Sequence, residues 1–169
     1  AIAHLDALLV AQAVPLQVRR AGVTMGRRML TIARLALEGT DGGRLLSRYA
    51  ALIDTRDTVD TGDIKGSGGC RSHPAIVLAI AGYALGAPPA AVAAAYLQSS
   101  VISLTQNAVR AIPLGQDAGQ RTIASVRGDV RAAVRRIGDL DGMDLGAAAP
   151  GIEISQMRHE RQRARMFMS

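Results

Sequence analysis

The stretch SHPAIVLAIAGYALG, residues 72–86, is apolar around its whole circumference when it is read as a helix. A helix of this kind is typical of the buried centre of a protein. Ser72 and Pro74 fit a capped start. The run is too short to cross a bilayer, which takes about 20 apolar residues. We therefore expect a soluble protein built around this segment.

Helical periodicity continues on both sides of the segment, and no alternating strand pattern is sustained. In the first helix, Ile2, Leu5, Leu9 and Leu8 are expected to face the core. The sequence predicts an all-α, single-domain helical bundle over 1–150, followed by a separate C-terminal tail over 151–169. The expected helices span 1–12, 16–37, 44–54, 72–86, 89–112 and 121–138.

Residues 55–71 differ from the rest, because glycine, serine and aspartate replace the apolar periodicity. We expect an exposed, mobile central loop with nothing that anchors a core. Cys70 and His73 lie three residues apart near its end, which is conceivable as half of a metal site. A closed structural site needs four ligands, so the alternative is a loop thiol and a histidine at a helix start. A single cysteine also favours a cytoplasmic protein without disulfides.

Composition and motifs argue against two classes of function, single-strand nucleic-acid binding by base stacking and catalysis. Aromatic residues make up 2 % of the chain, so single-strand nucleic-acid binding by base stacking has little to work with. The net charge of +6, with all basic residues except Lys65 being arginine, suits acidic proteins as well as nucleic acids. No Ser/His/Asp arrangement, carboxylate pair or HExxH motif is present, so we expect no enzyme.

The stretch PLGQDAGQR, residues 113–121, lies between two expected helices. It lacks the ending of a phosphate loop and follows no strand. Pro113 ends the incoming helix and Gly115 permits a reversal, while Asp117 and Gln120 have the spacing of a capping box. We expect a structural corner, followed by a helix with a basic stripe of Arg127, Arg131 and Arg135.

The C-terminal tail combines four arginines between 158 and 165 with methionines and the only phenylalanine. Terminal residues are usually frayed and solvated. Apolar anchors beside arginines are instead typical of a segment that docks on another protein. We therefore expect the tail to bind a protein partner.

Two motifs in this order resemble the urease accessory protein F (UreF) family. They are YLQSSVISLTQNAVRAIPLGQDAGQR, residues 96–121, and MRHERQRARMFMS, residues 157–169. GRRML, residues 26–30, and SHPAIVLAIAGYALGAP, residues 72–88, are also similar to the family. In the tail, Ala164 and Met166 replace the usual serine and leucine. The family's N-terminal segment, with its Pro-Thr-Gly and His-Ser-x-Gly-Leu-Glu elements, has no counterpart here.

The resemblance implies an all-helical protein that forms a homodimer and acts in urease maturation without catalysis. It implies binding to UreD/UreH, joint recruitment of the GTPase UreG, and nickel insertion into apo-urease, with nickel handled by the complex and no cofactor bound directly. A basic helical protein that binds nucleic acid is the alternative, as is a direct nickel carrier using Cys70, His73 and a tail histidine.

The resemblance also assigns residues to surfaces. It places Tyr96 at the dimer contact and Arg110 on a surface that faces UreG, and it makes Gln116 and Gln120 interface residues. The docking tail comprises Met157, His159, Glu160, Arg165, Phe167, Met168 and Ser169. No catalytic residue and no metal ligand is expected.

Overall fold

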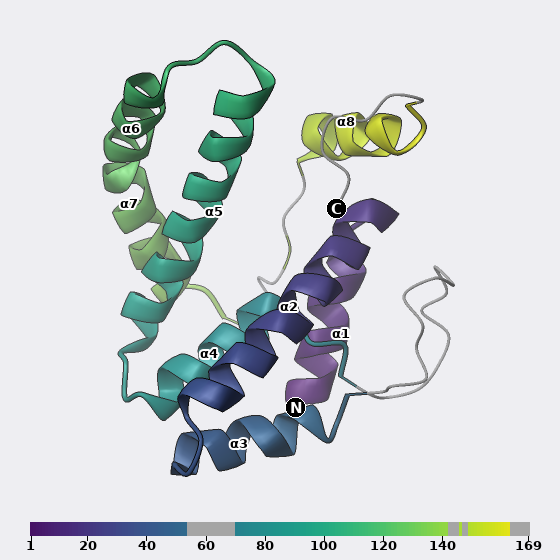
Figure 1. Cartoon of the computed structure of the whole chain (residues 1–169), viewed down its shortest axis with the longest axis vertical. Coiled ribbons are helices and arrows are strands. Elements are labelled where there is room, and N and C mark those ends of the chain that lie inside the picture. Colours follow the sequence, from purple (N-terminus) through teal and green to yellow (C-terminus); the bar gives the residue numbers. More distant parts are fainter. Residues whose placement is uncertain (54–69, 142–145, 147–148, 163–169) are drawn as a thin grey trace. The chain divides into compact units, whose positions relative to one another are not determined.

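The computed structural model describes residues 1–53, 70–141, 146 and 149–162. These residues form eight α-helices and one isolated β-bridge, between Ile53 and Cys70, which confirms the all-α class (Figure 1). The chain divides into two compact units, one of Ala1–Gly86 with Gly146–Ser169 and the other of Ala87–Leu145. Among the described helices, none has the length and apolar character needed to cross a membrane.

The first unit contains α1 (Ile2–Gln12), α2 (Leu16–Ala36), α3 (Asp41–Ala50), α4 (Pro74–Ala84) and α8 (Pro150–Glu160). Helix α4 packs against both α2 and α3, as Figure 1 shows. The buried core cluster consists of Leu30, Leu46, Tyr49, Cys70, Val77 and Ile80. The segment 72–86 is thus central, but it is not buried all round, because Tyr83 and Leu85 remain 77 % and 69 % exposed.

Glycine brings α2 against the segment that precedes α4. A Cβ atom built on Gly26 would lie 1.5 Å from the Ser72 carbonyl oxygen, so only glycine fits. Ser72 is fully buried with φ of 64°, in the left-handed region. The expected cap at Ser72 is wrong: His73 is the N-cap residue, and its Nδ1 accepts from the Ala75 N–H at 3.2 Å. Pro74 occupies the first turn as expected.

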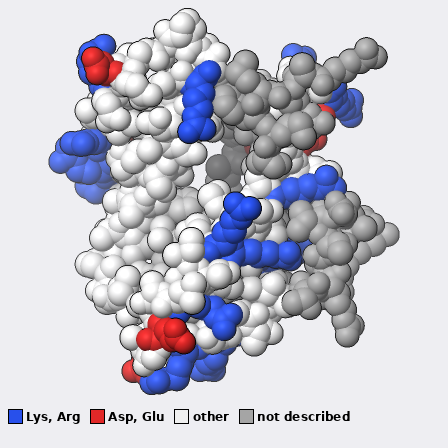
Figure 2. Space-filling model, in the orientation of Figure 1, with Lys and Arg blue, Asp and Glu red and all other residues white. Residues whose placement is uncertain are grey.

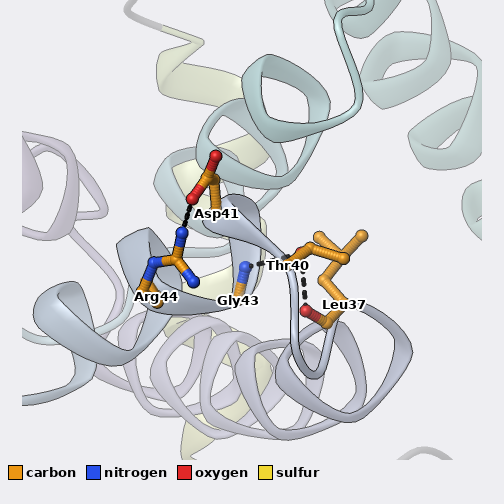
Figure 3. Close-up of polar contacts among 5 residues, drawn as sticks. All are labelled: Leu37, Thr40, Asp41, Gly43 and Arg44. Atoms are coloured by element: carbon orange, nitrogen blue, oxygen red, sulfur yellow. Dashed lines mark hydrogen bonds and ion pairs between the residues drawn. The ribbon is translucent and has the colours of Figure 1, made fainter.

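Helix α3 begins earlier than predicted, inside residues that read as a loop. The Thr40 hydroxyl accepts from the Gly43 N–H at 3.1 Å and donates to the Leu37 carbonyl at 2.6 Å (Figure 3). Asp41 and Arg44 form an ion pair one turn apart, also drawn in Figure 3. A threonine N-cap with an acidic residue in the first turn explains why the helix starts at Asp41.

The face that α1 buries differs from the predicted one. Asp6 and Val10 are buried, whereas Ile2, Leu5 and Leu8 are exposed. The prediction followed apolar periodicity alone, and it failed because hydrogen bonds draw the Asp6 carboxylate inward.

The predicted central loop, 55–71, lies outside the described residues except for its last two. Cys70 contradicts the expectation that nothing there anchors a core, since it is 1 % exposed within the core cluster. Its N–H donates to the Leu52 carbonyl at 2.8 Å, which fixes it beside the end of α3.

The second unit consists of α5 (Pro89–Ala111), α6 (Gln116–Ser125) and α7 (Arg127–Gly138), with α5 packed against the other two. The helix predicted over 121–138 begins at Gln116 and is divided at Val126. Ile123 and Val130 are buried, whereas Ile137, at the same helical spacing, is exposed. The predicted capping box is wrong, because Gly115 is the N-cap residue and Asp117 already lies inside the helix.

Candidate functional site

The C-terminal segment forms a helix, α8, that contacts α2 within the first unit (Figure 1). Three of the predicted docking residues lie on it: Met157 is 38 % exposed, while His159 and Glu160 are half-buried. The remaining four, Arg165, Phe167, Met168 and Ser169, lie outside the described residues. The docking role of the seven residues stays a prediction.

The polar end of α8 meets the first turn of α2. A Glu160 Oε1 atom accepts from the backbone N–H of Gln17 at 2.6 Å, across 143 residues of sequence. Helix α2 has no side-chain cap from its own N-cap residue, Pro15, so its early N–H groups need an outside acceptor. A carboxylate at a helix N-terminus is also favoured by the helix dipole. Glu160 therefore acts as a long-range cap of α2.

His159 contributes to the same contact. Its Nδ1 lies 3.3 Å from the Gln17 side-chain Oε1, where the ring nitrogen is the donor. A small cavity of about 230 Å³ lies between the two helices, lined by Gln17, Val18, Ala21, Gln156 and His159. The contact between the two helices thus combines hydrogen bonds at Gln17 with a partly apolar cavity wall formed by Val18 and Ala21.

The corner between α5 and α6 is an exposed turn. Arg110, in the last turn of α5, and Gln116, the first residue of α6, are both exposed. Gln120 lines a groove of about 730 Å³ between α5 and the pair α6 and α7, together with Arg127 and Arg131. The structure therefore brings Gln120 to the basic residues of α7, and it confirms the structural corner.

Tyr96, the predicted dimer contact, lies on α5 and is half-buried within the chain. Burial raises the pKa of its hydroxyl, so the side chain is neutral at physiological pH. Its carbonyl accepts from the hydroxyls of Ser99 and Ser100. Its role in dimer formation stays a prediction.

The basic stripe of α7 is present, since Arg127, Arg131 and Arg135 are all exposed. On the face drawn in Figure 2, the blue side chains are spread over separate places, some of them beside acidic ones. The stripe is a feature of one helix, α7.

Sequence reasoning missed a buried carboxylate, Asp6, which is fully buried. Its Oδ1 accepts from the Tyr49 hydroxyl at 2.8 Å and from the His73 N–H at 2.7 Å. Its Oδ2 accepts from the Arg71 N–H. Asp6 therefore joins α1 to α3 and to the residues before α4. The available signal was one aspartate inside an otherwise apolar helix.

The cluster around Asp6 also sets the environment of Cys70 and His73. Burial, and then the charge of Asp6, raise the pKa of the Cys70 thiol, so the thiolate that binds metals is disfavoured. The Nδ1 atom of His73 is already occupied as a helix cap. Within the part of the chain that is described, no group of three His, Cys, Asp or Glu side chains is arranged to hold a metal ion.

We expect the cap at His73 to make folding stability depend on pH. Burial lowers the pKa of His73 below 6.5, with Asp6 opposing part of the shift. The unfolded chain therefore binds the proton more tightly, and the stabilisation is complete above pH 6.5 and is lost as the pH falls through the folded pKa. The loss arises because the charged imidazole is disfavoured in this buried position.

Urea unfolding at pH 7.5 and 5.5 checks this prediction, with His73→Asn as the control, because asparagine caps helices without titrating near these pH values. We expect a smaller pH dependence in the variant. The same pH dependence in both proteins would contradict the assignment.

The UreF family model matches residues 1–127 of the chain. A urease accessory protein UreF of Arthrobacter sp. (strain FB24) is 49 % identical over 167 residues, covering 99 % of this chain and 67 % of the relative. That of Corynebacterium efficiens is 44 % identical over 168 residues, with 99 % and 66 % covered. That of Bacillus sp. (strain TB-90) is 38 % identical over 169 residues, with 100 % and 67 % covered. The chain thus spans about two thirds of the length of these relatives.

Proposed function

The chain belongs to the UreF family, and on that premise we propose that it acts in urease maturation as a non-enzymatic scaffold. With UreD/UreH it recruits the GTPase UreG, and the assembly inserts nickel into apo-urease. The relatives that support this proposal are named urease accessory proteins and match nearly the whole chain at up to 49 % identity.

The single observation that carries the docking part is the position of α8. This helix forms the first part of the predicted tail and contacts α2 within the first unit, while Met157 remains exposed. A helix held along one side and open on the other is suited to present a segment to a partner protein. The tail residues then extend the surface that α8 begins.

We assign the other predicted residues to two further surfaces. Tyr96 belongs to a homodimer contact on α5, a proposal supported by the exposed apolar side chains of Ile102 and Leu104 on the same helix. Arg110, Gln116 and Gln120 face UreG, with all three side chains exposed at the corner between α5 and α6. Nickel is the cargo of this assembly and not a resident cofactor of the chain.

Removing residues 157–169 is expected to abolish capture of UreD/UreH and, with it, of UreG. Loss of a clustered interface anchor typically weakens binding by more than about tenfold. A pull-down with purified UreD/UreH and UreG compares the full chain with a chain ending at Gln156. Circular dichroism of both proteins verifies that the remaining helices are retained.

The matched control is Arg135→Ala, which removes an exposed arginine of α7 outside the groove that Gln120 lines and leaves the tail intact. This variant should recover both partners as the full chain does. Equal recovery of both partners by the shortened chain would overturn the docking role of the tail. A shift of duplex DNA by the full chain, lost in Arg135→Ala, would favour nucleic-acid binding instead.

A further inference from the structure

Helix α8 has two sides with different chemistry. Gln156, His159 and Glu160 are half-buried, and two of them bond to Gln17 of α2. The opposite side is exposed and carries Ile154, Met157 and Arg158 on one helix face. Arg161, the C-cap residue directly after the helix, is also exposed and continues the spacing of three, four and seven.

The inner side is committed to the chain itself. The Glu160 carboxylate supplies an acceptor to an N–H group in the first turn of α2, at 2.6 Å. The N-cap residue of α2, Pro15, supplies no side-chain cap to that turn. Removing Glu160 leaves the Gln17 N–H without this acceptor, so the pair His159 and Glu160 has a structural task before any partner arrives.

The outer side has the composition of a docking surface. Ile154 and Met157 are 47 % and 38 % exposed, and Arg158 and Arg161, which follow them in the sequence, are exposed as well. No acidic residue belongs to this face, since Glu153 and Glu160 are both half-buried. Methionine and arginine are residues that protein interfaces favour.

We propose that α8 docks through Ile154, Met157, Arg158 and Arg161 onto a partner protein whose surface has an apolar groove edged by carboxylates, while His159 and Glu160 hold α8 on α2. The inference rests on the proposed function and deepens it by naming the contacting side. In this assignment, His159 and Glu160 belong to the intramolecular contact with α2 and not to the partner surface. Bare phosphates would leave Ile154 and Met157 without apolar contacts, and a helix with only two exposed apolar side chains at this face offers little to a membrane.

Hydrogen exchange of the chain without a partner tests the intramolecular half of the inference, which is the contact between Glu160 and Gln17. Glu160→Ala is expected to speed exchange of the Gln17 amide by at least about tenfold, because that N–H loses its acceptor. Glu153→Ala is the matched control, since Glu153 lies on the same helix and its carboxylate accepts from the N–H of Ala149 and not from α2. Unchanged protection of the Gln17 amide in Glu160→Ala would overturn this half.

The docking half is tested by titrating purified UreD/UreH against four versions of the full chain. Met157→Asp and the pair Arg158→Glu with Arg161→Glu are expected to weaken binding by about tenfold or more. Glu160→Gln, which keeps a side-chain oxygen as acceptor, is expected to stay within about threefold of the wild type. Tight binding by both outer-face variants, or a loss in Glu160→Gln equal to that in Met157→Asp, would overturn the assignment.

The outcomes separate this inference from the proposed function. If the wild-type chain binds UreD/UreH and the outer-face variants bind equally well, only the inference fails. If the wild-type chain does not bind, the proposed function fails together with outer-face docking, while the exchange result for Gln17 still stands. Binding of the wild-type chain to anionic vesicles or duplex DNA that is lost in the arginine pair variant would overturn the partner class.

Discussion

Replacing Gly26 with alanine is expected to lower the free energy of unfolding by about 3 kcal/mol or more, at the upper end of overpacking effects. The added Cβ would lie 1.5 Å from the Ser72 carbonyl oxygen and 2.7 Å from the Ser72 carbonyl carbon. Both atoms belong to the backbone, so no side-chain rotation relieves the clash. Helix α2 would have to separate from the start of α4, which opens the core at Leu30 and Val77.

Gly22→Ala is the matched control for this change. It lies one turn earlier on the same helix, and nothing is within 4 Å of a Cβ built there. Alanine is favoured over glycine in a helix by about 1 kcal/mol, so this variant should be neutral or more stable. Urea denaturation of the three proteins measures both effects. Similar stability of Gly26→Ala and the wild type would contradict the close approach of α2 and Ser72.

Replacing Asp6 with alanine is the second change with a large expected effect, a loss of about 3–5 kcal/mol in the free energy of unfolding. The Tyr49 hydroxyl and the backbone N–H groups of Arg71 and His73 would lose their acceptor. Each buried donor left unpaired costs about 1–3 kcal/mol, and effects within one network are not additive. Water molecules or a rearrangement of the core around Tyr49 would then have to supply hydrogen-bond acceptors to these donors.

Urea denaturation of two further variants provides the comparison for Asp6→Ala. Tyr49→Phe removes one donor and leaves the two backbone donors on the carboxylate, so we expect a smaller loss of about 1.5–3 kcal/mol. Asp117→Ala removes an exposed carboxylate in α6 and should change stability by no more than about 1 kcal/mol. An Asp6→Ala protein as stable as Asp117→Ala would show that the buried network contributes nothing.

The predicted helices were largely correct where prolines and apolar periodicity act locally. Pro89 opens α5 and Pro113 follows its end, and the predicted corner contains the turn at 112–115, after which α6 begins at Gln116. The errors concern helix boundaries set by less distinctive residues. Helix α3 starts at Asp41 through a threonine cap inside glycine-rich sequence, and a break at Val126 divides the helix expected over 121–138.

The candidate site was predictable in part. The tail residues from Met157 onward were identified from their composition and from the family motif, and the structure shows a helix there as far as Glu160, which the sequence analysis did not predict. The partner of that helix was not predictable, because Gln17 stands 143 residues away in the sequence. The burial of Asp6 was not predictable for the same reason, because its backbone donors at Arg71 and His73 are 65 and 67 residues away in the sequence.

By itself the sequence determined that the chain is helical, where prolines begin its helices, and to which family its two motifs are similar. These properties depend on residues within a few positions of one another, such as Pro74 and the residues around it. Only the tertiary structure decided that Asp6 is buried, that Gly26 has no room for a side chain, and that Glu160 caps α2. Those three features depend on atoms that packing brings together from distant parts of the chain, so the local periodicity of the sequence does not indicate them.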